Sequence, residues 1–327
     1  MMAPQSTVPR FPVPLLSVPA PTAAESTGPR RALRRALWAC LCLVACLGLP
    51  ACKTNNLSSK TEDEARLMIP VPICVKRLPR GSGPGVVVSL TPEEYWALLL
   101  PSFNRSAETI DPTAPDCSGR MTLMTLSPTG TNSLRVDPKK VTLAPGSDGL
   151  KIVWLQSHPL GEDSNEGLLA LIRQRESYLE VYAVGVHRGR PAGTRFTLQR
   201  MGPRLVVEAI QEDCTGEGSE RRCRASSAVY LMGTGALKAS ATYPVEQIAK
   251  GSWRDGTPVE YRFSASADYK DDAIELTEHL SVNSKAQGEI RSSDLQRALR
   301  LEQGQLVASG ESLWTKTLRE LGQKPGD

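Results

Sequence analysis

The feature that most constrains the fold of this 327-residue chain is a long succession of short segments in which apolar and polar residues alternate. The pattern starts near Gly119 and continues almost to the C-terminus. An alternation of period two is typical of β-strands with one buried face. We expect strands over Met121–Leu126, Lys140–Leu143, Leu150–Gln156, Leu168–Arg173, Tyr178–His187, Arg195–Gln199, Arg204–Gln211, Ala225–Met232, Ala236–Thr242, Val259–Ala267, Ala273–Asn283, Ala298–Glu302 and Gln305–Ser309.

Turn-forming residues separate these segments. Gly233-Thr234-Gly235, Asp255-Gly256 and Gln303-Gly304 supply residues that tolerate a positive φ, as tight turns between antiparallel strands require. Segments joined in this way are typical of an antiparallel meander that forms a sandwich or a barrel-like sheet. We therefore expect a mainly β fold, with an α+β fold as the alternative. Ser164–Glu176 stays ambiguous, because its leucines also suit a short helix.

Two short helices are expected beside the strands. Thr91-Pro92-Glu93-Glu94 combines an N-cap residue, a proline at the first helical position and a glutamate that completes a capping box. Pro101 ends this helix, and a short buried strand over Val86–Leu90 precedes it. A short C-terminal helix before Gly322 is predicted by the helical spacing of Leu313, Trp314, Leu318 and Leu321.

The first 51 residues have a different character. Residues 30–35 hold four arginines, and residues 36–49 are 14 consecutive residues without a charge. A basic segment followed by a short apolar one and by small residues is the layout of a secretory signal peptide. Fourteen helical residues rise about 21 Å, less than the roughly 30 Å of a bilayer's hydrocarbon core. A permanent membrane span is therefore the weaker interpretation.

The end of this leader, Leu49-Pro50-Ala51-Cys52, resembles the lipobox of bacterial lipoproteins, in which a leucine and a small residue precede an invariant cysteine. Pro50 departs from the usual small residue at its position. The resemblance implies that residues 1–51 are removed, that Cys52 carries a diacylglycerol thioether and an acylated amino terminus, and that the chain is anchored in the lipid bilayer of a cell envelope. The residue after the cysteine is Lys53 and not Asp, and in this the chain resembles lipoproteins that are sorted to the outer membrane.

Beyond Cys52 the chain divides into a tether and a domain. Residues 53–66 are polar and nearly free of apolar side chains. Such a tether has an r.m.s. reach of about 20 Å. We expect the β-rich exported domain to span residues 67–327, and a sub-boundary near residues 119–140 is left open.

The charge balance excludes one class of partner. The chain carries a net charge of +4, but the leader supplies it, since residues 1–51 hold five arginines and one acidic residue. Equal numbers of basic and acidic side chains remain in the other residues. A neutral domain has no electrostatic footprint for nucleic acid and no bulk attraction to anionic lipid. We therefore expect no nucleic-acid partner.

Four cysteines remain outside the leader and the lipidation site, namely Cys74, Cys117, Cys214 and Cys223. An even number in an exported domain indicates two disulfides, with three possible connectivities. The most economical pairing is Cys74–Cys117 and Cys214–Cys223, since the second pair brackets a polar loop. A zinc site is less favoured, because no two of these cysteines lie two to four residues apart. A catalytic thiol is the least favoured.

The sequence offers no catalytic, metal-binding or cofactor-binding motif. His158, His187 and His279 are outside any metal-binding spacing, and the chain lacks a Gly-x-Ser-x-Gly elbow. Residues 81–85 and 233–236 are superficially similar to phosphate loops, but neither ends in Gly-Lys-Ser/Thr. We expect no cofactor, no metal and no catalytic residue. Charged clusters expected in solvated turns are Glu212-Asp213, Arg221-Arg222-Cys223-Arg224 and Asp271-Asp272.

Three functional hypotheses follow. The leading one is a non-enzymatic, membrane-anchored interaction module that docks with other envelope proteins through exposed sheet edges. The second is a carrier that holds an apolar or glycan ligand, and its discriminating feature is a cavity. The third is a hydrolase whose site is assembled from distant residues, for example His158 or His279 with a carboxylate.

Overall fold

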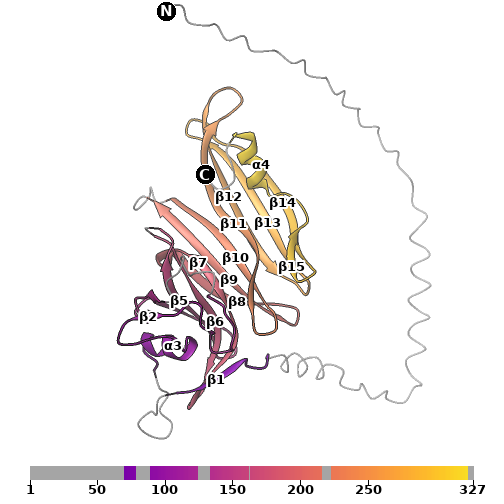
Figure 1. Cartoon of the computed structure of the whole chain (residues 1–327). Coiled ribbons are helices and arrows are strands. Elements are labelled where there is room, and N and C mark those ends of the chain that lie inside the picture. The colour runs from indigo at the N-terminus through magenta and orange to yellow at the C-terminus, as the bar shows by residue number, and fades with distance from the viewer. Residues whose placement is uncertain (1–69, 79–88, 124–132, 162, 216–221, 323–327) are drawn as a thin grey trace, which may run out of the picture. The chain divides into compact units, whose positions relative to one another are not determined.

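The computed structural model describes residues 70–78, 89–123, 133–161, 163–215 and 222–322, which belong to one compact unit (Figure 1). The leader, Cys52 and the tether lie outside the described residues, so their assignments stay predictions. The same holds for Val86–Val88 and for residues 124–126, which belong to two of the predicted strands.

The fold is mainly β and antiparallel, as predicted. Its two larger sheets have the strand orders β1-β7-β6-β5-β4 and β15-β14-β13-β12-β11-β10-β9-β8, and neither closes into a barrel over the described residues. The five-stranded sheet contains β1 (Cys74–Arg77), β4 (Val141–Pro145), β5 (Leu150–Pro159), β6 (Asn165–Gln174) and β7 (Tyr178–Gly189). The eight-stranded sheet contains β8 (Thr194–Met201), β9 (Arg204–Thr215), β10 (Arg222–Met232), β11 (Leu237–Ser252), β12 (Pro258–Tyr269), β13 (Ala273–Ser284), β14 (Gly288–Glu302) and β15 (Gln305–Ala308).

The short elements complete the fold. Strands β2 (Thr109–Ile110) and β3 (Leu134–Arg135) pair with each other, and a 3₁₀ turn spans Pro191–Gly193. Helix α3 (Pro92–Leu99) begins with the predicted capping box, in which the Glu94 side chain accepts from the Thr91 N–H. Helix α4 (Leu313–Glu320) is the predicted C-terminal helix.

Several predicted elements differ from the structure. Met121 to Leu123, the described part of one predicted strand, lies in a loop and a turn. The ambiguous segment after Ser164 is strand β6, because it is buried between β5 and β7 and pairs with both. Strands β11 and β14 are much longer than predicted, since their polar halves lack an apolar alternation and are held by ladder pairing to neighbouring strands.

The two large sheets pack face to face. Trp154, Leu171 and Ala183 of the five-stranded sheet contact Phe196 and Val207 of the eight-stranded sheet in one buried cluster. On its other face, the five-stranded sheet is covered by α3 and the segments around it. This sandwich accounts for strands β5 and β6 being buried along almost their whole length.

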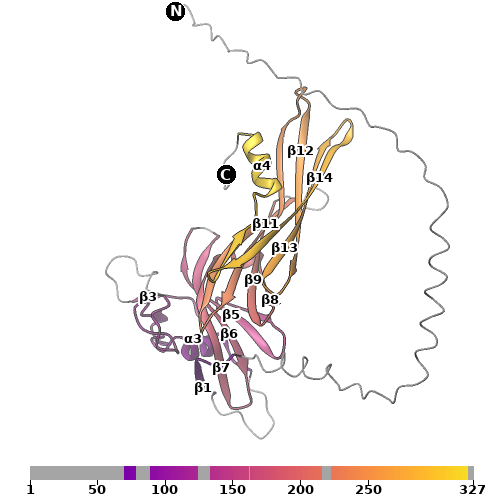
Figure 2. The ribbon, with the colours of Figure 1, turned by 90° about the vertical axis from the view of Figure 1, so that its right-hand side faces the viewer.

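The eight-stranded sheet also bends back on itself. Val206 of β9 and Val229 of β10 face away from the sandwich core and pack against Ile274 of β13 and Leu299 of β14. Elsewhere on this sheet, Phe263 of β12 and Val282 of β13 pack against Trp314 of α4, which covers that part of the sheet (Figure 2). The long meander therefore buries two separate apolar clusters. One face of β9 contributes Val206 to the first cluster and then lines the groove described below.

Both predicted cysteine pairs lie at disulfide distance, with Sγ atoms 2.17 Å apart for Cys74–Cys117 and 2.15 Å apart for Cys214–Cys223. The first pair joins edge strand β1 to the loop after α3. The second is a cross-strand pair, because Cys214 of β9 and Cys223 of β10 are direct partners in the ladder.

Candidate functional site

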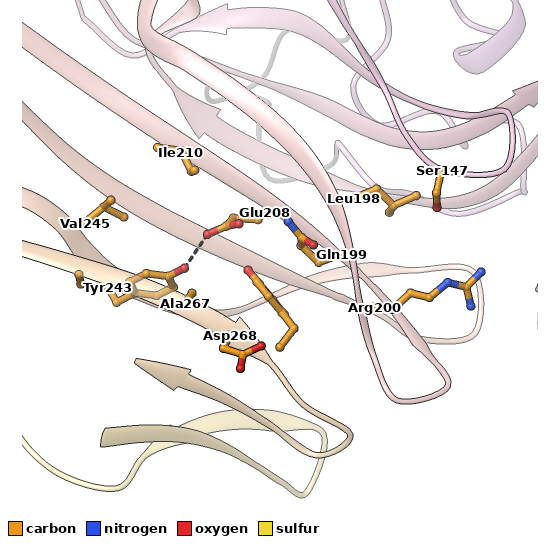
Figure 3. A pocket seen from close by; sticks show the side chains of 12 residues that line it. Ser147, Leu198, Gln199, Arg200, Glu208, Ile210, Tyr243, Val245, Ala267 and Asp268 are labelled. Carbon is orange, nitrogen blue, oxygen red and sulfur yellow. Dashed lines mark hydrogen bonds between the residues drawn. The ribbon is translucent and has the colours of Figure 1, made fainter. Parts of the chain in front are cut away.

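The bend of the eight-stranded sheet leaves a groove of about 640 Å³ on the face of β9 that points away from the sandwich core (Figure 3). This volume is in the range of small-molecule sites in proteins. The lining side chains come from β8, β9, β11 and β12 and from the loop before β5. They are Ser147, Leu198, Gln199, Arg200, Glu208, Ile210, Tyr243, Val245, Ala265, Ala267, Asp268 and Tyr269.

Small side chains on β12 make room for the groove. The inward positions of this strand alternate with exposed ones, and the first three, Val259, Tyr261 and Phe263, are large and buried under α4. The next two are Ala265 and Ala267, which line the groove. The change from large to small residues on one face therefore separates the filled part of the sheet from the open part.

Glu208 is the chemical centre of this groove. Strand β9 alternates, so that Val206, Glu208 and Ile210 share one face, and Glu208 is only 6 % exposed. Its Oε1 accepts hydrogen bonds from the Tyr243 hydroxyl at 2.5 Å and from the Ser227 hydroxyl at 2.7 Å. Its Oε2 accepts only a longer bond, 3.3 Å, from the Thr197 hydroxyl. Three hydroxyl groups thus donate hydrogen bonds to one carboxylate, and Oε2 accepts fewer of them than Oε1.

Two phenols stand beside this carboxylate. Burial, followed by the nearby charge of Glu208, raises the pKa of Tyr243 above its usual range. Burial also raises the pKa of Tyr269, with further contributions from Tyr243 and Glu208. Both hydroxyls therefore stay protonated. The buried Tyr269 hydroxyl makes no hydrogen bond of ordinary geometry within the described part of the chain, but it lies close enough to Glu208 and Tyr243 to interact with both.

No ion pair within the described residues neutralises Glu208. The charged residues at the groove, Arg200 and Asp268, are exposed and engaged elsewhere, since Arg200 pairs with Asp148 and Asp268 with Lys270. A buried carboxylate without a cationic partner is costly, because desolvation disfavours the charge. The groove therefore has a mixed polar and apolar lining and one buried acceptor that has capacity for a further donor.

The histidines singled out in the sequence lie apart from this groove. His187 is buried between the sheets, where its Nδ1 is 2.7 Å from the Tyr230 hydroxyl and its ring contacts Trp154 edge-on. Burial lowers the pKa of His187 to about 4. The Nδ1 of His158, on β5, is buried without a partner among the described groups.

His279 is the one of the three that has a carboxylate partner in the described chain. Its Nδ1 lies 2.8 Å from Asp294 Oδ1, and Ser264 is its direct neighbour in the ladder on the other side. Serine, histidine and aspartate thus stand in one row across β12, β13 and β14. The row lies on an exposed face, and the described cavities do not include it.

The other charged or glycine-rich motifs lie in strands, ion pairs or turns of the described structure. The expectation of a solvated turn is wrong for Glu212 and Asp213, which lie in strand β9, and for Arg222 to Arg224, which lie in strand β10, because the two strands pair beyond the disulfide. Glu212 forms an ion pair with Arg195, and Asp213 with Arg190 at 2.5 Å. Asp271 and Asp272 lie in the exposed turn between β12 and β13, as expected, and residues 233–235 form the turn before β11. Arg221 and the loop Gly81–Gly85 are outside the described residues. The described residues also contain no cluster of three or more potential metal ligands.

The sequence analysis missed Glu208 and its partners. The signal was present, because Glu208 interrupts an apolar face between Val206 and Ile210. What the sequence does not reveal is that Tyr243, Ser227 and Thr197 converge on it from three other strands. Among the described helices, none has the length and apolar character that a membrane crossing requires.

In comparisons with known proteins, no protein-family model, no curated protein and no solved structure matches this chain. A function for the chain is therefore inferred from the residues of the groove.

Proposed function

We propose that this protein is a binding protein whose groove in the eight-stranded sheet holds a small molecule with a polar group and an apolar part. The observation that carries the proposal is the buried Glu208 carboxylate, which faces a groove of about 640 Å³ with a mixed polar and apolar lining and has no cationic partner among the described residues. Ligand pockets combine apolar surface with placed polar groups that fix the ligand's orientation.

The expected lipid anchor fits this role. Two or three acyl chains on Cys52 hold a protein at a membrane lastingly, and the tether lets the domain stand off the surface. A binding protein held in this way meets its ligand in the space next to the membrane. Lipidation and envelope location remain implied by the lipobox resemblance, and the groove argument does not depend on them.

The proposal is tested by filling the groove. In the variant Ala267→Phe a large ring occupies the space beside Glu208, whereas Ser266→Phe places the same ring on the exposed face of the same strand. We expect native mass spectrometry of the full chain from its native host to find a bound small molecule. That molecule should be lost in Ala267→Phe and kept in Ser266→Phe. The proposal fails if the purified chain carries no such molecule, or if both variants retain it equally.

Docking to other envelope proteins is a second candidate function, and the edge strand β1 favours it. β1 pairs with β7 on one side and has no partner strand on the other within the described residues. Val75 on this strand is 54 % exposed. An open edge with exposed apolar residues can accept a strand from another protein. The strand also follows the expected tether closely along the chain.

Cross-linking in intact cells tests this second function. Val75→Lys places a charge on the edge, which disfavours strand pairing. Val307→Lys is the matched control, since Val307 is also an exposed valine on an edge strand, β15. We expect a cross-linked partner that disappears in Val75→Lys and remains in Val307→Lys. Equal cross-linking by both variants would exclude β1 as the docking edge.

A further inference from the structure

We infer that the ligand of the groove is an organic amine that binds as its ammonium ion, with the charged nitrogen at Glu208 Oε2 and its hydrocarbon part against the apolar side chains of the lining, such as Ile210 and Val245. This inference rests on the proposed function and names the ligand class for the same site. Three properties of the groove support an ammonium ligand: its charge, its unused hydrogen-bonding capacity and the side chains around the carboxylate.

The charge of the groove favours a cation. Glu208 is surrounded by hydroxyl groups from Tyr243, Ser227 and Thr197, which donate hydrogen bonds but bring no positive charge. An ammonium ion adds the missing charge and forms a charge-assisted hydrogen bond, which is about twice as strong as a neutral one. A neutral alcohol can form the hydrogen bond but leaves the charge uncompensated.

The hydrogen-bond count indicates where the nitrogen binds. Oε1 already accepts two short bonds, whereas Oε2 accepts one bond at 3.3 Å. A carboxylate offers about four lone-pair positions, so Oε2 has room for an N–H donor. The faces of Tyr243 and Tyr269 can add cation–π attraction, and both residues line the same groove.

The walls argue against a bare metal ion. Calcium takes six to eight oxygen ligands, and magnesium an octahedral set. Glu208 is the only buried carboxylate that lines this groove in the described chain, and the lining also includes the apolar side chains of Leu198, Ile210, Val245 and two alanines. These apolar side chains suit an alkyl or aryl group attached to the nitrogen.

Calorimetric titration of the full chain with hexylamine and with hexan-1-ol tests the inference, since the two probes have the same hydrocarbon chain. We expect hexylammonium to bind at least about tenfold more tightly, as a hydrogen bond to a charged group predicts. Glu208→Gln should abolish this preference, because it removes the charge and keeps the side-chain shape. Glu275→Gln is the matched control, since Glu275 is exposed on β13 and its loss changes the net charge equally.

The outcomes separate the ligand class from the proposed function. Equal binding of the two probes, lost in Ala267→Phe, would overturn the ammonium inference and leave the groove as the binding site. Binding that Ala267→Phe does not weaken would place the site elsewhere and overturn both. Failure of hexylamine to bind at all would overturn the inference, and the native mass measurement would then decide on the groove. Thermal unfolding of each variant checks that it is folded, and Ile210→Trp is a second groove-filling variant.

Discussion

The eight-stranded sheet contains two buried glutamates in similar strand positions but with opposite surroundings. Glu278 on β13 is fully buried, and its Oε1 accepts from Arg297 Nε at 2.5 Å. Its Oε2 accepts the Leu313 N–H at 2.7 Å, at the start of α4. Glu208 on β9 has only hydroxyl partners. One carboxylate is neutralised and tied to a helix, and the other faces an open groove.

The difference separates a structural role from a binding role. Glu278 has a cation and a backbone donor at a helix N-terminus, where a negative charge is favourable. Both of its oxygens are therefore committed within the fold. Glu208 lacks a cation in the described chain and keeps capacity on Oε2. The comparison predicts that the same substitution, Glu to Gln, affects mainly stability at position 278 and mainly binding at position 208.

Glu278→Gln is expected to have the largest effect on stability. The amide cannot neutralise Arg297, whose side chain is only 8 % exposed, and an uncompensated buried charge remains. We expect a loss of about 3–5 kcal/mol in the free energy of unfolding. Urea denaturation of the variant and of the unmodified chain, both with intact disulfides, measures it.

An exposed ion pair is the control for this first prediction. Arg195→Gln breaks the pair with Glu212, and both side chains of that pair are partly or largely exposed. Its loss should cost less than about 1 kcal/mol. If Glu278→Gln lowers the free energy of unfolding no more than Arg195→Gln does, Glu278 does not have the structural role that its partners predict.

The structure explains why the sequence does not distinguish these two sites. Glu208 lies between Val206 and Ile210, and Glu278 lies between Leu276 and Leu280, so both have the same local pattern. The surroundings of the two glutamates depend on segments that are distant in sequence. For Glu278, Arg297 lies on the next strand, and Leu313 at the start of α4 is 35 residues farther along the chain.

Local signals were more readily predicted. The capping box of α3 is complete within residues 91–94, and the spacing in α4 is also local. The order of the strands in the eight-stranded sheet is also a local property, because short turns join strands that are consecutive in sequence and adjacent in the sheet. The bend of the sheet, which creates the groove, depends instead on packing between Val206, Val229 and Ile274, residues that are far apart in sequence. Alternation along a single strand contains no information on such a bend.

The sandwich core differs from both glutamate sites in its response to acid, because it contains the buried titratable group His187. Burial lowers the pKa of His187 to about 4, whereas an unfolded histidine titrates near 6.5. The stability due to the neutral ring is therefore complete above about pH 6.5 and is lost as the pH falls from there towards 4. The loss amounts to about 3 kcal/mol over this window.

Urea titrations between pH 4 and 7.5 measure this loss. Asp and Glu side chains titrate near the acid end of the window, so the variant His187→Phe isolates the histidine by difference. Its stability should change less between pH 6.5 and 4 than that of the unmodified chain. Equal slopes for both would show that His187 is not the group responsible. The two glutamates are best compared above pH 6.5, where His187 is neutral in both states.

The Cys214–Cys223 pair tests whether the groove depends on the hairpin that carries it. This pair links β9 and β10, which hold Glu208 and Ser227. Replacing both cysteines by serine opens a short loop, and the chain-entropy estimate is a loss of about 2–3 kcal/mol. We expect binding of hexylamine to persist, because eight ladder pairs of the hairpin lie on the groove side of the disulfide. Loss of binding in a folded variant would mean that the disulfide positions Glu208.

Glu208→Gln is expected to have the smallest effect on stability, within about 1 kcal/mol of the unmodified chain. The variant loses acceptor capacity for one of three hydroxyls, which costs stability, but it also removes a buried charge that has no cationic partner, which is favourable. The two effects oppose each other, whereas at position 278 both act in the same direction. The measurement is the urea titration used for Glu278→Gln, at the same pH. A loss of 3 kcal/mol or more at position 208 would assign Glu208 a structural role like that of Glu278, and the groove would then lose the feature that indicates a ligand.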